Sequence, residues 1–186
     1  MSKQFLTPPI QMPDWAVAFE TEALNKPFYG DEEKIRFAIQ LAIENVRHGT
    51  GGPFGAAIFD SKTDHLIAIG INSVVPAKQS WAHAEMTAYA RAQHRLGTYH
   101  LQGCLIATSC EPCAMCCGAT PWSGIECMLY GATKADAEAV GFDEGDKGEA
   151  WVEALQKRSI DVRGPILHEE AKVPFIHYRE CTGKIY

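Results

Sequence analysis

Short apolar runs alternate with helix-forming segments along most of this 186-residue chain, and the alternation restricts the folds that it can adopt. Two of the runs enclose the polar stretch Asp60–His65, which predicts a β-hairpin. Asp31 can cap a first long helix, and Gly49 and Gly97 can end two helices. The expected strands are Phe54–Phe59, Leu66–Ile71, Cys104–Thr108, Cys127–Tyr130 and Ile160–Arg163, and the expected helices are 31–48, Trp81–Leu96, one starting at Pro112, Thr133–Ala139, Glu149–Lys157 and Pro174–Cys181. This pattern predicts an α/β protein, a three-layer α/β/α sandwich with a five-stranded mixed sheet.

The first thirty residues differ from the rest of the chain, because they carry four prolines: Pro8, Pro9, Pro13 and Pro27. Proline lacks a backbone N–H and interrupts helices. We therefore expect residues 1–30 to form an extended arm with one helical turn near Asp14–Leu24. The absence of internal repeats and linkers predicts a single domain over residues 31–186.

Composition favours a globular protein whose substrate is a small molecule. Hydrophobic residues make up 46% and charged residues 22% of the chain, and no apolar run approaches the roughly 20 residues that span a bilayer. The net charge is −6 and the 17 Lys and Arg residues are scattered, whereas nucleic-acid-binding proteins gather positive charge. We see no secretory signal and expect the cytoplasm, where the seven cysteines would not serve as disulfides.

Two short segments carry the chemistry: His83-Ala84-Glu85 and Pro112-Cys113-Ala114-Met115-Cys116. A catalytic zinc commonly has three protein ligands, imidazole or thiolate, and one open position, where it makes water reactive at neutral pH. Cys113 and Cys116 lie three residues apart in the first turn of an expected helix, so both sulfurs face one side and the helix dipole favours thiolates. His83 would be the third ligand, and Glu85 would carry protons beside the metal.

A lone C-x-x-C motif has two other interpretations, half of a structural zinc site or a redox pair. A structural site needs a second C-x-x-C or an H-x-x-x-H at finger-like spacing, and the chain has neither. A redox pair needs a thioredoxin-like context and leaves His83 and Glu85 without a purpose. The set of four residues therefore favours catalytic zinc.

The pairing of H-x-E with P-C-x-x-C is the zinc-deaminase signature. From about Asp31 to Tyr186 the chain resembles the cytidine deaminase superfamily, and it is most similar to the bacterial guanine deaminases of that superfamily. The narrower match rests on Gly141-Phe142-Asp143-Glu144 and the terminal Tyr186. Other matching stretches are Gly51-Gly52-Pro53-Phe54-Gly55-Ala56, Asn72, Ala82–Glu85, Thr108–Cys116, Trp122 and Ala137-Glu138-Ala139.

The resemblance implies roles for residues that spacing alone does not single out. Phe54 and Trp122 would border a flat base, Asn72 would hydrogen-bond its polar edge, and Glu144, where the family usually has Asp, would be a second proton carrier. From spacing alone, a role in the core is as well supported for Phe54 as a role in binding. Glu144 lies in an acidic stretch of the kind that usually forms a solvated loop. The implied substrate-binding set is Phe54, Asn72, Ala82, His83, Trp122, Asp143 and Tyr186, beside one Zn²⁺ per subunit on His83, Cys113 and Cys116.

The resemblance also implies a homodimer in which the C-terminal segment, residues 160–186, is exchanged between subunits. Tyr186 would then close the pocket of the neighbouring subunit.

Three functions follow from this pattern. The first is deamination of guanine to xanthine, in which water attacks C2, Glu85 carries its proton to the ring and Glu144 assists the loss of ammonia. The second keeps the zinc chemistry but changes the substrate to tRNA adenosine, cytosine or another amino-heterocycle, although the acidic charge balance disfavours tRNA. The third is a zinc-stabilised binding or scaffold domain without turnover, in which Glu85 would have no purpose.

Overall fold

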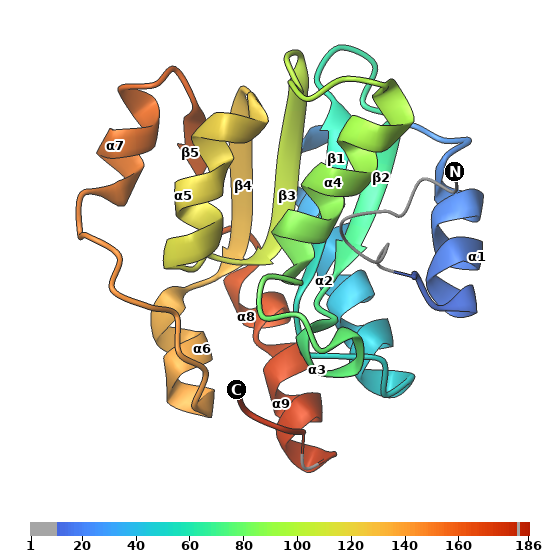
Figure 1. Ribbon diagram of the computed structural model, residues 1–186, viewed down its shortest axis with the longest axis vertical. Coiled ribbons are helices and arrows are strands. Elements are labelled where there is room, and N and C mark those ends of the chain that lie inside the picture. The colour runs from blue at the N-terminus through green and yellow to red at the C-terminus, as the bar shows by residue number, and fades with distance from the viewer. Residues whose placement is uncertain (1–10, 182) are drawn as a thin grey trace, which may run out of the picture.

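Five β-strands form one mixed sheet in the computed structural model, which describes residues 11–181 and 183–186 (Figure 1). The strands are β1 (Gly55–Asp60), β2 (Leu66–Ile71), β3 (Cys104–Cys110), β4 (Cys127–Ala132) and β5 (Asp161–Arg163), and their order is β2-β1-β3-β4-β5. β1 pairs antiparallel with β2 and β3, whereas β4 lies parallel to both β3 and β5. The predicted hairpin and mixed sheet are confirmed.

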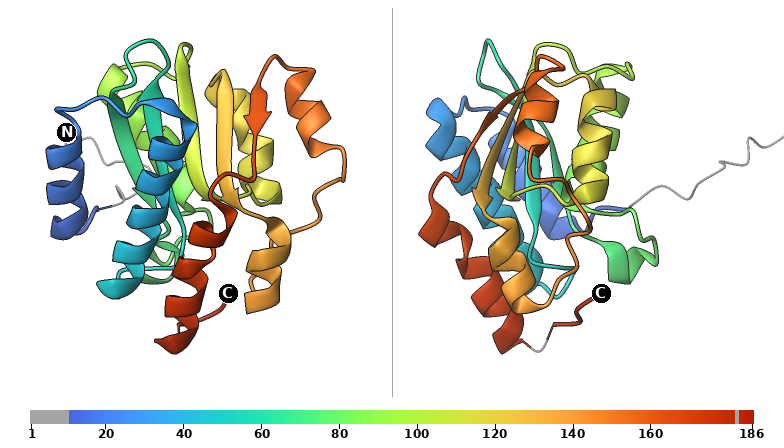
Figure 2. Two further views of the ribbon diagram at one scale, coloured as in Figure 1. Left: turned by 180° about the vertical axis from the view of Figure 1, so that it is seen from behind. Right: turned by 90° about the vertical axis from the view of Figure 1, so that its left-hand side faces the viewer.

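Helices cover both faces of this sheet, and the central strands β1, β3 and β4 are buried at every position except Asp60. One face carries α1 (Asp14–Ala23), α2 (Gly30–Arg47), α8 (His168–Ala171) and α9 (Val173–Glu180), and the other carries α4 (Ala84–Leu96), α5 (Ala114–Ser123) and α7 (Trp151–Gln156) (Figures 1 and 2). The short α3 (Val74–Ala77) and α6 (Lys134–Val140) lie near the end of the sheet where β2, β3 and β4 finish (Figure 1). The predicted α/β/α sandwich is confirmed.

In the described part of the first thirty residues, the helical turn expected near Asp14–Leu24 is present, but it is a longer helix than expected and not part of an extended arm. Residues 14–23 form the ten-residue helix α1, which buries Ala16, Glu20 and Ala23 at helical spacing. Glu20 accepts a hydrogen bond from the Ile69 N–H of the edge strand β2 at 3.0 Å and pairs with two arginines of α4. α1 is therefore attached to the sheet edge and to α4, and the domain boundary expected at residue 30 stays a prediction. The first ten residues of the expected arm lie outside the described residues.

Glycines let two helices approach the sheet at very short range. A Cβ atom added at Gly70 of β2 would lie 2.0 Å from the Ala84 carbonyl oxygen of α4. A Cβ atom at Gly55 of β1 would lie 2.5 Å from the Ala38 carbonyl oxygen of α2. The separation between α4 and the sheet is therefore set by direct backbone contact.

The C-terminal segment packs against α2 on its own domain. Phe175 and Tyr178 of α9 are buried in the core on that face of the sheet, and the Tyr178 hydroxyl donates to the Lys184 carbonyl oxygen at 2.7 Å. From there the chain turns back toward the ends of the central strands (Figure 1). Within residues 11–181 and 183–186, no helix combines the length and the apolar character that crossing a bilayer requires.

Candidate active site

His83, Cys113 and Cys116 meet where α4 and α5 begin. His83 is the N-cap residue of α4 and Cys113 the N-cap residue of α5, so both have extended backbones and project from helix N-termini. The potential ligand atoms of the three residues all lie within 4.8 Å of one another. Because α4 follows β2 and α5 follows β3, the cluster lies at the carboxyl ends of these strands (Figure 1).

The donor set and its spacing fit zinc. Bond lengths of about 2.3 Å to sulfur and about 2.0 Å to nitrogen place two ligands of a tetrahedral zinc about 3.5 Å apart. The His83 Nδ1 and Cys113 Sγ atoms are 3.5 Å apart. A hydrogen bond from the Cys116 thiol lowers the pKa of Cys113 to about 4, and His83 and the Cys116 N–H contribute in the same direction against burial. A thiolate, the form that binds metal, is thus already favoured at Cys113.

Two buried carboxylates flank this cluster. The exposed fractions of Glu85 and Glu144 are only 7% and 6%. Burial, assisted by the negative charge of Cys113, raises the pKa of Glu85 to about 7 and that of Glu144 to about 8. Both groups can therefore hold and release a proton near neutral pH, as general acid–base catalysis requires.

A cavity of about 310 Å³ opens in front of the cluster. Its walls include these residues that the sequence singled out: Phe54, Asn72, His83, Glu85, Cys113, Asp143, Glu144 and Tyr186. The Phe54 ring meets Phe142 edge-on at 4.9 Å between centroids, so Phe54 serves both the cavity wall and the core beneath it. A volume at the lower end of the range for small-molecule sites suits a compact substrate.

Asn72 is held in one orientation by the end of the chain. Its Oδ1 atom accepts hydrogen bonds from the Tyr186 hydroxyl at 2.5 Å and from the Val74 N–H at 3.3 Å. The amide NH₂ group is therefore the part of Asn72 that remains to donate a hydrogen bond to a ligand. Gly52 makes room for this contact, since a Cβ atom there would lie 2.3 Å from the Tyr186 hydroxyl oxygen.

Tyr186 reaches Asn72 of the same chain, which bears on the expected exchange of residues 160–186. In this structure the segment completes its own pocket, so no exchange is needed to bring Tyr186 to the site. The physical reason is local: α9 buries Phe175 and Tyr178 on its own domain, and the Gly183 N–H donates to the Tyr178 carbonyl oxygen at 2.9 Å.

Two residues of the predicted substrate-binding set do not line the cavity. Trp122 is 77% exposed, and its ring lies against the Arg158 guanidinium. It stands six residues after Cys116, and a helix rises 1.5 Å per residue, which carries Trp122 about 9 Å along α5 from the nearer cysteine of the metal cluster. Ala82 is fully buried behind His83, where its carbonyl oxygen accepts a hydrogen bond from the Ser73 N–H.

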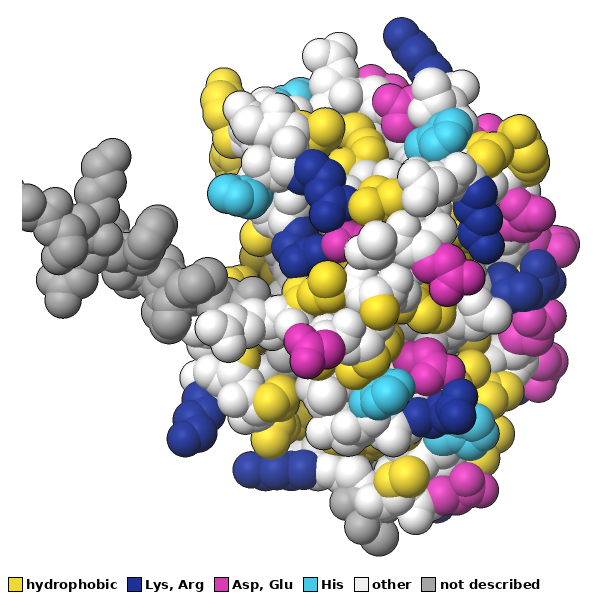
Figure 3. Space-filling model, turned by 90° about the vertical axis from the view of Figure 1, so that its right-hand side faces the viewer, with side chains coloured by type: hydrophobic (Ala, Val, Ile, Leu, Met, Phe, Trp, Pro, Cys, Tyr) yellow, Lys and Arg dark blue, Asp and Glu magenta, His cyan; other side chains and the backbone are white. Residues whose placement is uncertain are grey.

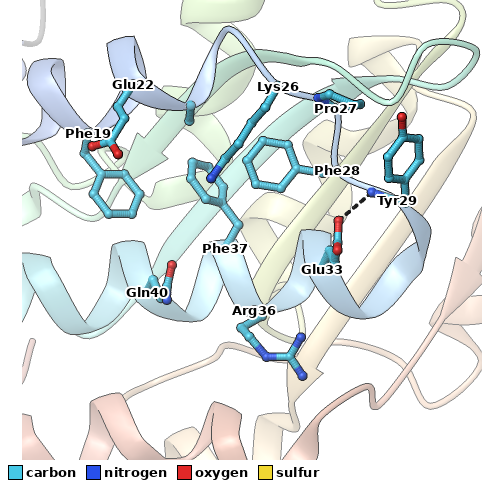
Figure 4. Close-up of a pocket in the computed structure, with 11 residues that line it drawn as sticks. Phe19, Glu22, Lys26, Pro27, Phe28, Tyr29, Glu33, Arg36, Phe37 and Gln40 are labelled. Carbon is cyan, nitrogen blue, oxygen red and sulfur yellow. Dashed lines mark hydrogen bonds between the residues drawn. The ribbon is translucent and has the colours of Figure 1, made fainter.

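The cavity also contains residues to which the sequence assigned no role. Glu111 and Phe142 both occur in stretches that carry the family resemblance, directly beside residues that had roles, and Val74 and Ser80 come from the connection between β2 and α4. A second cavity of about 490 Å³ lies between α1 and α2 and includes Lys26, Phe28 and Arg36 (Figure 4). It shares no lining residue with the first.

Comparison with known proteins matches residues 30–132 to the cytidine and deoxycytidylate deaminase zinc-binding region. The chain is 44% identical to the guanine deaminase of Bacillus subtilis over 153 residues, which cover 82% of this chain and 96% of that protein.

Solved structures agree with the sequence relatives. The guanine deaminase of Nitrosomonas europaea superimposes with a TM-score of 0.88 at 36% identity, covering 94% of this chain and 97% of that one. A variant of the protein NE0047 in complex with 8-azaguanine gives a TM-score of 0.89 at 35% identity, covering 96% and 99%. The chain therefore belongs to the cytidine and deoxycytidylate deaminase family of zinc-dependent hydrolases, on the branch that contains the bacterial guanine deaminases.

Proposed function

We propose that this protein removes the exocyclic amino group of guanine by hydrolysis and releases xanthine and ammonia, a step in purine breakdown. The observation that carries the proposal is the clustering of His83, Cys113 and Cys116 between two buried carboxylates at the floor of a small cavity. The relatives named above support guanine as the substrate, because they include guanine deaminases, and the NE0047 variant is in complex with 8-azaguanine, an analogue of guanine.

Each group in the cavity has a role in this reaction. His83, Cys113 and Cys116 would hold one zinc ion, and a bound zinc would lower the pKa of the water that reacts at C2. Glu85 takes a proton from that water and returns it to the ring nitrogen beside C2. Glu144 delivers a proton to the departing amino group and receives the proton that the C2 hydroxyl loses, so that C2 releases ammonia and keeps the oxygen as a carbonyl.

The substrate is bound as a flat base with a polar edge. Phe54 contacts one face of the ring, and the Asn72 NH₂ group donates a hydrogen bond to an acceptor on its edge. Asp143 and Tyr186 border the opening of the cavity, and His83 lies at its floor beside the reacting carbon. On the face of the molecule in Figure 3, Lys and Arg side chains are interspersed with Asp and Glu, which suits an uncharged small substrate better than a nucleic acid.

The proposal includes a homodimer in the cytoplasm. The outward face of α5 is an apolar stripe at helical spacing, in which Met115, Gly118 and Trp122 are exposed, and it is suited to burial against a second copy. A reducing compartment protects the thiolates of the metal site. Light scattering on the protein eluted from a size-exclusion column measures the mass of the assembly. We expect Trp122→Asp to convert a dimer into a monomer.

The test is ammonia release from guanine, adenine, cytosine, cytidine and a tRNA substrate, with zinc measured in the same protein sample. We expect release from guanine at one zinc per chain, and loss of release with retained zinc in Glu85→Gln. Ammonia release from cytosine or cytidine but not from guanine would reject guanine as the substrate. A folded protein without zinc would reject the mechanism.

A further inference from the structure

The loop between α6 and α7, which carries Glu144, is tied to the metal-ligand turn by a buried lysine. The Lys147 ammonium donates hydrogen bonds to the Glu111 carboxylate and to the Pro112 carbonyl oxygen, both at 2.6 Å. Only 4% of the Lys147 side chain is exposed, and its ammonium lies 4.2 Å from the ring centroid of Trp151. A buried ammonium with two hydrogen bonds and a contact to an aromatic ring is fixed in position, unlike a solvated surface charge.

The loop holds Cys113 from both sides. The Pro112 carbonyl oxygen, just before Cys113, is bound by Lys147, and the Ala114 N–H, just after it, donates to the Glu144 carbonyl oxygen at 2.9 Å. The Ala114 N–H is one of the donors at the start of α5 that have no acceptor within the helix itself. The backbone of Glu144 is therefore positioned directly against the backbone of the metal-binding turn.

A second lysine and a second contact of Glu111 complete the attachment. Lys134 of α6 donates through its ammonium to the Gly145 carbonyl oxygen at 2.7 Å, and its backbone N–H donates to Glu111 at 3.1 Å. Glu111 thus connects the start of α6, Lys147 and the turn that begins at Pro112. Of these groups, the Lys147 ammonium is the one that contacts both the Glu111 carboxylate and the metal-ligand turn.

We infer that Lys147 is a positioning residue for deamination: with Glu111 it holds the loop so that the Glu144 carboxyl group meets the amino group that leaves C2. This inference rests on the proposed function and extends it to a residue that does not line the cavity. Lys147 acts through Glu144, so its loss should impair the departure of ammonia and leave ring binding and attack by water in place.

A change of leaving group separates these steps. In guanine the bond from C2 to nitrogen breaks with transfer of a proton to nitrogen, which gives ammonia. In 2-fluorohypoxanthine the same attack by water on C2 is followed by loss of fluoride, which takes the electron pair of the C2–F bond and needs no proton from Glu144. Both reactions give xanthine, and the second releases fluoride and one proton to the solvent.

The experiment compares Lys147→Met with the wild type on both substrates, measuring ammonia and fluoride release over a range of substrate concentrations up to saturation. Misplacement of a reacting group by about 1 Å can cost up to about a hundredfold in rate. We expect kcat for guanine to fall between about tenfold and a hundredfold, while KM, zinc content and fluoride release stay close to wild type. Glu144→Gln should show the same selectivity, and Lys147→Met should cost little more in the Glu144→Gln background, because the two residues act as one unit.

Controls separate this inference from a loss of folding and from a failure of the proposed function. Lys147→Arg keeps the charge and should recover part of the guanine rate, and Lys157→Met, at an exposed lysine of the following helix end, should change nothing. If Lys147→Met does not fold, the double variant Glu111→Gln, Lys147→Met removes both charges and undergoes the same comparison. Equal losses on the two substrates, or an unchanged guanine rate, would overturn the inference, whereas a wild type inactive on guanine would overturn the proposed function.

Discussion

Asn45 offers a direct test of how the core of the domain shapes the cavity. This residue of α2 is completely buried, and its NH₂ group donates to the Gly52 and Asn72 carbonyl oxygens, both at 2.8 Å. Its Oδ1 atom accepts a hydrogen bond from the Thr50 hydroxyl at 2.8 Å. One side chain therefore joins the glycine-rich turn before Phe54 to the backbone of Asn72.

We expect Asn45→Ala to lower the free energy of unfolding by about 4 kcal/mol. Three hydrogen bonds contribute about 1 kcal/mol each, and the Asn72 carbonyl oxygen, left buried without this donor, adds about 1 kcal/mol more. The Gly52 carbonyl oxygen keeps the Phe54 N–H as a donor and adds nothing further. In a domain of this size the loss corresponds to a fall in Tm on the order of 8–16 °C.

Urea denaturation followed by tryptophan fluorescence and circular dichroism measures this change. The matched control is Gln40→Ala, at an exposed position of the same helix, which should stay within about 0.5 kcal/mol of wild type. At a temperature where both variants are folded, Asn45→Ala should also raise KM, because Asn72 loses its backbone anchor. A loss of less than about 1 kcal/mol in the free energy of unfolding would refute this account of the buried amide.

Three further variants test other parts of the structure. Glu20→Ala leaves the Ile69 N–H at the sheet edge and two partly exposed arginines without their carboxylate. We therefore expect the free energy of unfolding to fall by about 2 kcal/mol and aggregation on heating, measured by light scattering, to increase. An unchanged urea midpoint would mean that the sheet edge does not need α1. Gly52→Ala should displace Tyr186 and raise KM about fivefold, the value of one hydrogen bond, with zinc content unchanged; an unaltered KM would show that the contact with Asn72 does not affect binding. Burial raises the pKa of Asp136, but hydrogen bonds from Thr133 and the nearby His168 outweigh it and hold the pKa below its usual 3.8. The ionised carboxylate therefore contributes stability above pH 3.8, and this stability is lost as the pH falls through the lower pKa of the folded state. Asp136→Asn should lower the free energy of unfolding by about 1 kcal/mol at pH 7 and by nothing below both pKa values. An equal cost at every pH in urea titrations would contradict this.

The elements that the sequence predicted well are those whose information is local. The hairpin of β1 and β2 and the helices α2 and α4 follow from apolar runs, capping residues and terminal glycines, and they appear where those signals stand. α1 was predicted at the right place, near Asp14–Leu24, but only as a single turn, because its buried face consists of two alanines and Glu20, and hydrophobic periodicity does not register a buried carboxylate. Its burial depends on two arginines more than seventy residues away.

The candidate site divides in the same way. The three potential metal ligands and Glu85 lie in two short motifs, so the sequence indicated them directly. The contact between Asn72 and Tyr186 joins residues 114 positions apart, and only the family resemblance pointed to either one. Lys147 follows an acidic stretch that is typical of a solvated loop, and nothing local indicates that its ammonium is buried. The resemblance pointed to Trp122 without specifying its distance along α5, and in this structure Trp122 does not line the cavity of its own chain.

The backbone contact between Gly70 and α4 has a consequence for any attempt to give this scaffold a new substrate. A methyl group at Gly70 would push the first turn of α4 outward and shift His83 relative to Cys113, which belongs to a different helix and would not follow. Metal affinity is thus sensitive to a position on β2 that is absent from the cavity wall. The residues proposed to contact the base, in contrast, stand on connecting segments and at the chain end, so pocket shape can be redesigned there while the spacing of the ligands is preserved.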